Sequence, residues 1–207
     1  LWEVEAERND VLPLADSLVG RLASVTLPDY GPAATAVFHP ISGPISDEAL
    51  PMLAGGGRII ADAEVGKAPA GVLFAFGDST GGFAAYVFDG CVAATLALPG
   101  GTVRTRAERP LSPGRHDIGC VLRPEPHGGV TVDLTIDDEV VATTTSNHCL
   151  PFIWQHGGTR LSIGSERGLP VDEGTPPFNG EVHQVRIEAL DFRLLITDTV
   201  RSALRAE

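Results

Sequence analysis

The sequence is poor in basic residues and in long hydrophobic runs. Its 207 residues carry 15 Lys and Arg against 27 Asp and Glu, a net charge of −12, which excludes a basic surface for nucleic acid or for anionic lipid. No stretch approaches the ~18 uninterrupted apolar residues that a membrane helix requires. A chain of this mass can bury enough surface for one core, so we expect a soluble domain with appendages.

The first residues show no recognisable signal peptide from which the compartment could be predicted. The chain starts at Leu1, and no sequence of charged, apolar and then small residues follows it. Lys67 is the only lysine among the 15 basic residues, a bias typical of bacteria with GC-rich genomes. We therefore expect a soluble bacterial protein of unassigned compartment, with the cytoplasm preferred over an exported location.

Cysteine is scarce. Cys91, Cys120 and Cys149 are odd in number and widely spaced, which fits neither a disulfide framework nor a zinc pattern such as C-x-x-C. Unpaired cysteine is usually interior. We expect buried free thiols.

The two ends of the chain predict little β structure. Residues 1–24 repeat apolar positions at three-to-four spacing with Pro13 between them, which predicts a helical hairpin or broken helix. Residues 25–57 are rich in Pro and Gly, so we expect an extended connector in which only Thr35–Phe38 has a strand pattern. The tail, 191–207, predicts a short capped helix.

From residue 58 to 190 the sequence predicts an antiparallel β-sandwich or barrel, because short β-type runs alternate with turn residues about every ten positions. Asp89-Gly90 and Asp137-Asp138 are the expected tight hairpin turns, and Asp-Gly supplies the positive φ that such a turn needs. The run 130–136 alternates apolar and polar residues, so one of its faces should be buried and the other exposed. The expected strands are 58–65, 71–76, 83–88, 91–98, 102–106, 115–123, 129–136, 139–145, 159–163 and 181–190. The expected core residues are Phe83, Phe88, Leu96, Val121, Leu134, Ile136, Leu161, Ile163, Val185 and Ile187.

One segment imitates a catalytic motif. Gly77–Gly81 matches G-x-S-x-G around Ser79 and is similar to the GDS block of SGNH hydrolases. A nucleophile elbow needs a helix after the serine, whose amides stabilise an oxyanion, but an aromatic β-type run follows instead. No Asp has a His three positions later, as the SGNH family requires. We therefore interpret the segment as a glycine-rich hairpin loop.

Metal-binding patterns are incomplete. None of the six histidines forms H-x-x-x-H. His148, Cys149 and His156 could meet at a metal ion, although two adjacent residues rarely face one ion. Acidic residues at loop tips could supply oxygens to Ca²⁺, but no calcium loop of fixed spacing is present, and solvated turns are the simpler interpretation. The candidates are Glu166 and Asp172, with Asp78, Asp137, Asp138 and Glu173 as further acidic tips.

Two segments resemble known sandwich domains. Leu111–His116, followed by an alternating strand and an acidic turn, resembles the L-x-x-G-x-H and hairpin core of concanavalin A-like and laminin G-like sandwiches. Phe178–Ile187 is similar to their closing strand. The resemblance implies a mainly β fold, an antiparallel jelly-roll sandwich over 58–190 with a helical arm before it and a helix after it.

More narrowly, the chain up to about Ile187 resembles the carboxyl-terminal region of bacterial arylsulfatases, which depend on formylglycine. Two departures are Ala15, where the family has Asp, and Glu166, which replaces the Asp of a glycine-flanked loop and counts against a calcium role there. The matching blocks, in the family's order, are Glu7–Leu14, Arg58–Val65, Gly81–Gly90 and Gly164–Val171.

This resemblance implies that the sulfatase active site lies outside the chain. The family's C-x-P-x-R motif, whose Cys becomes formylglycine beside a divalent metal such as Ca²⁺, is reduced here to Cys149-Leu150-Pro151, with Ile153 in place of the sulfate-binding Arg. We expect no catalytic residue, no cofactor and no sulfatase activity in this chain alone. The first functional hypothesis is a non-catalytic module, whose arm 1–24 ends or follows a catalytic domain and packs on it or on a second subunit.

Two further functions compete with this hypothesis. A lectin-like module that binds a glycan follows from the fold by analogy, but sugar sites usually expose aromatic rings, and the Trp and Tyr residues are only Trp2, Tyr30, Tyr86 and Trp154. An autonomous esterase would depend on Ser79 alone. Nucleic acid and membranes are not expected partners.

Overall fold

The computed structural model describes residues 2–9, 35–40, 44–51, 53–98, 101–125, 128–148, 160–167, 169–172 and 175–190. The chain divides into two compact units, residues 1–30 with 193–207 and residues 31–192. The described part of the first unit is helix α1 (Trp2–Arg8) with Asn9, where Trp2 and Val4 are exposed and Ala6 is buried. The rest of the expected arm and the expected C-terminal helix lie outside the described residues.

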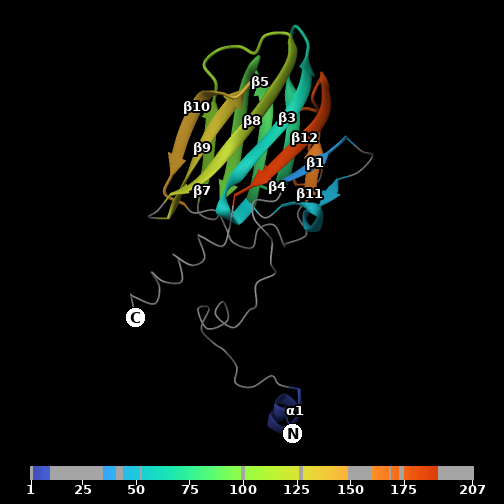
Figure 1. The fold of residues 1–207 in the computed structure, drawn as a ribbon, viewed down its shortest axis with the longest axis vertical. Helices are drawn as coiled ribbons and strands as arrows, with labels where there is room; N and C mark the ends of the chain where they lie inside the picture. The colour runs from blue at the N-terminus through green and yellow to red at the C-terminus, as the bar shows by residue number, and fades with distance from the viewer. Residues whose placement is uncertain are drawn as a thin grey trace. The chain divides into compact units, whose positions relative to one another are not determined.

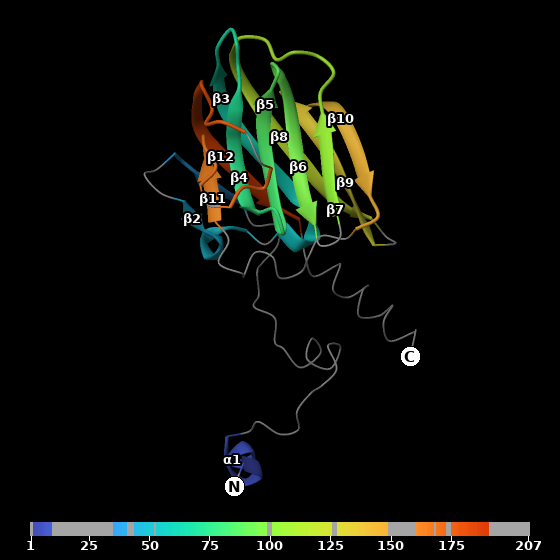
Figure 2. The same ribbon diagram turned by 180° about the vertical axis from the view of Figure 1, so that it is seen from behind.

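The second unit is a sandwich of two six-stranded antiparallel sheets, which confirms the predicted fold. Sheet A faces the viewer in Figure 1 and sheet B in Figure 2. Sheet A contains, in spatial order, β1 (Thr35–Phe38), β12 (Glu181–Ala189), β3 (Gly57–Val65), β8 (Gly114–Glu125), β9 (Gly129–Ile136) and β10 (Glu139–Ser146). Sheet B contains β2 (Ile45–Ser46), β11 (Arg160–Ile163), β4 (Gly71–Asp78), β5 (Gly81–Phe88), β6 (Cys91–Leu98) and β7 (Gly101–Arg106).

The expected connector contains more structure than predicted. Strand β1 is confirmed, but the two-residue strand β2 and the 3-10 turns η1 (Asp47–Ala49) and η2 (Leu53–Gly55) were not expected. Strand β2 is too short to produce a periodic pattern, and it forms only because β11 pairs with it. Its place at the edge of sheet B is therefore a tertiary effect.

The predicted turns have the expected backbone. Asp89 and Gly90 have φ of 48° and 72°, and Asp137 and Asp138 have φ of 51° and 66°, as tight primed hairpins require. The segment around Ser79 is a hairpin loop as predicted, because β5 follows directly after β4 and no helix stands between them.

The core lies between the two sheets, where Phe74 and Phe83 pack with ring centroids 5.8 Å apart. Most of the expected core is confirmed, but Phe88 is 52% exposed and Val121 is only half-buried. Phe88 shares the outward face of β5 with Tyr86 and lies at the end of the strand, where Arg106 stacks on its ring at 5.4 Å. The expected core residues that are fully buried are Phe83, Leu96, Leu134, Leu161, Val185 and Ile187; Ile136 and Ile163 are partly buried against them.

The prediction of an exposed face on β9 is wrong. Thr131, Asp133 and Thr135 point away from the core, yet all three are buried. Asp133 accepts hydrogen bonds from Arg123 of β8 and from Thr143 of β10, the latter at 2.7 Å. The long side chains of neighbouring strands therefore cover a polar face that alternation alone assigns to solvent.

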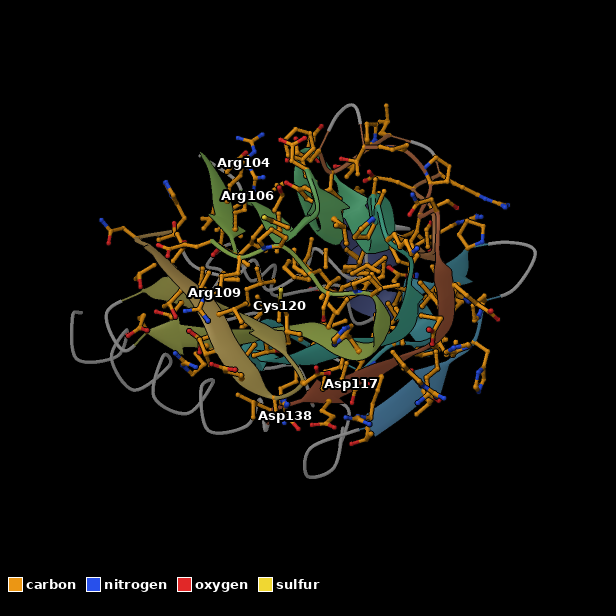
Figure 3. The ribbon with its side chains drawn as sticks, turned by 90° about the horizontal axis from the view of Figure 1, so that it is seen from above. Arg104, Arg106, Arg109, Asp117, Cys120 and Asp138 are labelled. Carbon is orange, nitrogen blue, oxygen red and sulfur yellow. The ribbon has the colours of Figure 1, made fainter. Side chains whose placement is uncertain are left out.

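Two of the three cysteines lie in the described part of the chain. Cys91 and Cys120 are free and buried, as predicted, and Figure 3 shows Cys120 between the sheets. Burial, with the charge of Asp133, raises the pKa of the Cys120 thiol far above its ordinary value, so this thiol is unreactive. Cys149 lies outside the described residues. No described helix has the length and apolar character needed to cross a membrane.

Candidate functional site

A cleft of about 450 Å³ opens at the end of the sandwich where the β7–β8 connection passes from sheet B to sheet A. One wall is residues 107–112 of that connection, and His116 of β8 lies at its base. The other wall is residues 136–141 around the β9–β10 turn, without Asp138. Figure 3 looks onto this end of the sandwich and labels Arg109 on the connection.

The connection that forms the first wall is fixed to the β5–β6 hairpin. The amide of Ala107 donates to the carbonyl of Val92 at 2.8 Å, and the amide of Leu111 donates to that of Gly90 at 2.7 Å. The Leu111 side chain is buried in the core. The wall is therefore held by the backbone at two points.

His116 joins the two walls. Its Nδ1 lies 2.7 Å from Asp137 Oδ2, and its Nε2 lies 3.0 Å from the carbonyl oxygen and 3.2 Å from Oγ of Ser112. The amide of Asp117 donates to Asp137 Oδ1 at 2.9 Å. Contacts on both sides of the imidazole fix the connection to the hairpin turn, which explains the His of the L-x-x-G-x-H pattern structurally.

The cleft is predominantly negative. Burial alone would raise the pKa of Asp137, but hydrogen bonds from His116 and from the Asp117 amide outweigh burial and hold this pKa below its ordinary value. The side chains of Glu108, Arg109 and Glu139 are exposed, and within the described ranges none of these side chains forms an ion pair or hydrogen bond. The lining therefore contains three carboxylates, one guanidinium and one imidazole.

The shifted carboxylate predicts an acid-sensitive turn. Since the pKa of Asp137 is lower in the folded chain than the ~3.9 of an unfolded Asp, its charge stabilises the fold above that value and this contribution is lost as the pH falls through the folded pKa. We expect Asp137→Asn to lower the melting temperature at pH 7. The difference in melting temperature between this variant and the native chain should become smaller as the pH falls toward 3. Asp138→Asn is the control, because Asp138 forms an exposed ion pair with Arg58, and such pairs contribute little. Parallel melting curves for Asp137→Asn and the native chain across this range would contradict the prediction.

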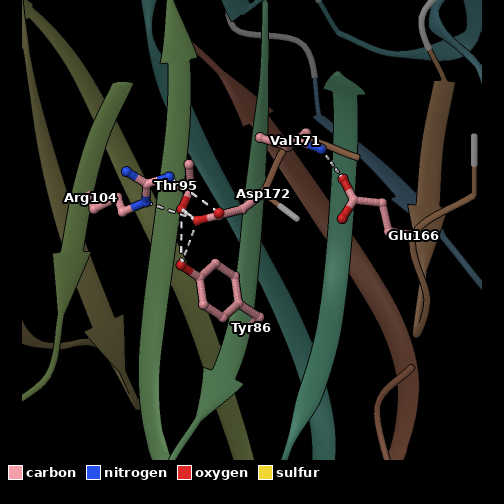
Figure 4. Close-up of polar contacts among 6 residues, drawn as sticks. All are labelled: Tyr86, Thr95, Arg104, Glu166, Val171 and Asp172. Carbon is pink, nitrogen blue, oxygen red and sulfur yellow. Dashed lines mark hydrogen bonds and ion pairs between the residues drawn. The ribbon is translucent and has the colours of Figure 1, made fainter. Parts of the chain in front are cut away.

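The two calcium candidates lie in the connection between β11 and β12, which crosses the outer face of sheet B (Figure 4). Asp172 Oδ2 accepts hydrogen bonds from Thr95 Oγ1 at 2.6 Å, Arg104 Nε at 3.0 Å and Tyr86 Oη at 3.1 Å, and its Oδ1 accepts one from Arg104 at 3.2 Å. Glu166 accepts a hydrogen bond from the amide of Val171. Both oxygens of Asp172 are thus occupied by donors.

The pKa values of Asp172 and Glu166 are shifted in opposite directions. Burial alone would raise the pKa of Asp172, but the hydrogen bonds from Arg104, Thr95 and Tyr86 outweigh it and lower this pKa. Burial raises the pKa of Glu166, and the charge of Asp172 adds to that shift. Of the two carboxylates, Asp172 is therefore the one whose charged form is stabilised by donors on the sheet. Among the described residues, no group of three or more His, Cys, Asp or Glu is placed to hold a metal ion.

The remaining acidic candidates lie apart from one another. Asp78 Oδ1 accepts from the amide and the hydroxyl of Thr80 at 2.7 and 2.6 Å inside its own hairpin loop, and Asp138 pairs with Arg58 at 2.6 Å. Glu173, Cys149 and His156 lie outside the described residues. His148 is described and exposed, so the hypothesis of a metal site at these three residues, His148, Cys149 and His156, stays a prediction. The sequence analysis missed Arg104 and Arg109, since single arginines give no pattern, and it used His116 only as a sign of the fold.

Comparisons with known proteins identify the fold. No protein-family model and no curated protein matches the chain, so the narrower resemblance to arylsulfatases has no support from them. Among solved structures, the chain is similar to the CBM40 of a Ruminococcus gnavus IT-sialidase bound to α2,3-sialyllactose, with a TM-score of 0.49, 15% identity and coverage of 79% of this chain and 97% of that one.

Two further structures have slightly higher TM-scores. A K499G mutant of NanB sialidase from Streptococcus pneumoniae matches with a TM-score of 0.52, 13% identity and coverage of 78% of this chain and 27% of that one. The LG4-5 domains of the mouse laminin α1 chain match with a TM-score of 0.51, 13% identity and coverage of 75% and 41%. The chain therefore spans less than half of either protein chain, and the likeness is one of fold, a concanavalin A-like or laminin G-like sandwich.

Proposed function

We propose that this sandwich is a non-catalytic carbohydrate-binding module and that the cleft beside His116 is its sugar site. The observation that carries this proposal is the set of polar side chains on two rigid walls, Glu108 and Arg109 on one and Glu139 on the other, without partners among the described residues. The walls are joined by His116 and Asp137. A concave site with a few fixed polar groups is the usual form of a small-ligand site.

The chemistry of these groups suits a neutral sugar. A sugar hydroxyl both donates and accepts, so it can donate to a carboxylate of Glu108 or Glu139 while an adjacent hydroxyl accepts from the guanidinium of Arg109. An acidic sugar would be repelled, because the lining holds three carboxylates and one guanidinium. The described residues of the lining include no Phe, Tyr or Trp, so binding should depend on hydrogen bonds and be weak.

The sandwich fold supports the proposal without specifying the ligand. It is shared with a sialidase chain and with laminin LG domains, and one fold serves many functions. The ligand is therefore inferred from the side chains of the cleft.

We expect the chain to bind neutral oligosaccharides on a glycan array, with a dissociation constant of about 0.1–1 mM. Arg109→Gln and Glu139→Gln should each weaken binding about tenfold or more in calorimetric titrations, since a hydrogen bond to a charged group contributes ~1.5–3 kcal/mol. Arg160→Gln is the control, because Arg160 is exposed on β11, outside the cleft. Absence of binding to every neutral glycan, or binding that neither cleft variant weakens, would overturn the proposal.

A second candidate function is the non-catalytic module of an arylsulfatase. The four matching sequence blocks in the family's order favour it, and the exposed Trp2 and Val4 of α1 offer apolar surface to a catalytic domain or a second copy of the chain. Formylglycine and a divalent metal would then belong to the catalytic domain. A C-x-P-x-R motif encoded upstream of Leu1 in the same reading frame would support this candidate, and an upstream sequence without one would remove it.

A further inference from the structure

The outer face of sheet B holds an unusual buried polar group. Ala84, Ala93 and Ala97 make this face flat and apolar, and Val171 from the β11–β12 connection packs on it. Among these small side chains, the hydroxyls of Tyr86 and Thr95 lie 2.9 Å apart and are almost fully buried, with residue exposures of 8% and 0%. Burying hydroxyls on an alanine surface is costly unless an acceptor meets them.

The acceptor that meets them is a carboxylate. Tyr86 of β5, Thr95 of β6 and Arg104 of β7 converge on Asp172 from three adjacent strands (Figure 4). The pairing of Ala93 with Tyr86 and of Thr95 with Arg104 fixes their spacing. The donors therefore belong to the rigid sheet, and the carboxylate belongs to a connection.

The connection is attached to sheet B without the help of Asp172. The amide of Gly164 donates to Leu73 at 2.8 Å, the amide of Val72 donates to Pro176 at 2.9 Å, and Phe178 closes the base of the connection by donating to Gly164 at 2.9 Å. These backbone bonds hold both ends of the connection on β4. Asp172 can therefore leave its donors without releasing the ends of the connection.

We propose that Tyr86, Thr95 and Arg104 form a second ligand site, for a carboxylate-bearing sugar, which the chain keeps filled with its own Asp172. A fork of guanidinium hydrogen bonds together with two hydroxyls is a receptor for a carboxylate. The alanine surface beside it is covered by Val171, so a sugar ring would take the place of Val171 when that residue leaves together with Asp172. The choice of a sugar rests on the function proposed above, whereas the choice of a carboxylate rests on these contacts alone.

The native chain should bind such a ligand weakly, because its apparent affinity is reduced by the small fraction of molecules in which Asp172 has left the donors. Removing the internal carboxylate should therefore reveal the site. We expect Asp172→Ala to bind glucuronate at least tenfold more tightly than the native chain. Asp172→Asn should lie between the two, because its amide oxygen is a poorer partner for a guanidinium than a carboxylate is.

The test combines thermal melting with NMR titration of the Arg104 Nε–H signal. In Asp172→Ala, 100 mM glucuronate or acetate should raise the melting temperature by about 3–5 °C over the same ionic strength of chloride, with glucuronate effective at lower concentration, and glucose should have no effect. Adding Arg104→Gln should abolish the rescue. Asp172→Asn keeps the shape of the side chain and permits the NMR titration if Asp172→Ala does not fold.

Asp62→Ala is the matched control. Asp62 has a similarly low side-chain exposure, 11% against 19%, and accepts two hydrogen bonds from Arg115, but no hydroxyl of the described residues joins them. Equal rescue of Asp62→Ala and Asp172→Ala would show a non-specific carboxylate effect and overturn the proposal. Rescue by acetate without glucuronate would overturn it as well. Cleft variants such as Arg109→Gln should leave this rescue unchanged, so the two sites fail or succeed independently.

Discussion

Leu134→Ala is expected to lower the free energy of unfolding by about 2–5 kcal/mol, the sum of the lost transfer free energy and the cavity left behind. Leu134 lies in the middle of β9, pairs in register with Cys120 of β8, and is 0% exposed in the core between the sheets. The sheets on both sides limit how far the site can collapse, so we expect a large loss. Urea denaturation of both proteins measures it.

The matched control is Val140→Ala on the neighbouring strand β10. Val140 is 53% exposed, so its truncation should change the stability by no more than about 0.5 kcal/mol. Equal denaturation midpoints for Leu134→Ala and the native chain would mean that Leu134 does not pack between the sheets.

Gly71→Ala, at the first residue of β4, should lower the free energy of unfolding strongly. Gly71 has a φ of +109°, which side chains rarely adopt, and a Cβ there would lie 2.3 Å from the carbonyl oxygen of Pro177. The clash is with backbone at the base of the β11–β12 connection, so it cannot be relieved by a rotamer change. We expect about 1–2 kcal/mol from the backbone conformation and a further ~1–3 kcal/mol from overpacking, measured by urea denaturation.

Gly164→Ala separates these two contributions. Gly164 also has a positive φ, +72°, but a Cβ at this position meets nothing within 4 Å. It should therefore show the conformational cost alone. A loss for Gly71→Ala no larger than that for Gly164→Ala would refute the close approach of Pro177 to β4.

The two candidate sites differ in the sign of their charge. The cleft presents three carboxylates, whereas the donors around Asp172 are two hydroxyls and a guanidinium. Arg106 lies two positions after Arg104 on β7, beside the exposed ring of Phe88. We therefore expect neutral sugars at the end of the sandwich and carboxylated sugars on sheet B.

Local patterns predicted most of the fold. Alternation and turn residues placed every long strand to within a few residues, and Asp89-Gly90 required a primed hairpin turn whatever its surroundings. Local sequence also predicted that the segment around Ser79 is a hairpin loop and not a nucleophile elbow, because a β-type run cannot supply the helix that an elbow needs. These properties depend on neighbours within a few positions in the chain.

Burial was predicted less well, because it depends on what covers a strand. The sequence analysis placed Phe88 in the core, and alternation along 130–136 placed Thr131 on an exposed face, but the structure reverses both. Phe88 lies on the outward face of β5 at the end of the sheet, and Thr131 lies under the side chains of Glu125 and Thr145. The sequence pattern of a strand does not show whether residues from other strands cover its outward face.

The sequence by itself determined the strands, their turns and the free thiols of Cys91 and Cys120, because each follows from short-range periodicity or composition. Periodicity left a sandwich and a barrel open, and the resemblance to concanavalin A-like and laminin G-like domains implied the sandwich that the structure has. Only the tertiary structure decided which polar side chains meet. Asp172 lies 68 positions from Arg104 and 86 from Tyr86, and His116 lies 21 positions from Asp137. Strand order and register bring such residues together, and a pairing shifted by one residue would turn their side chains to the opposite face of the sheet.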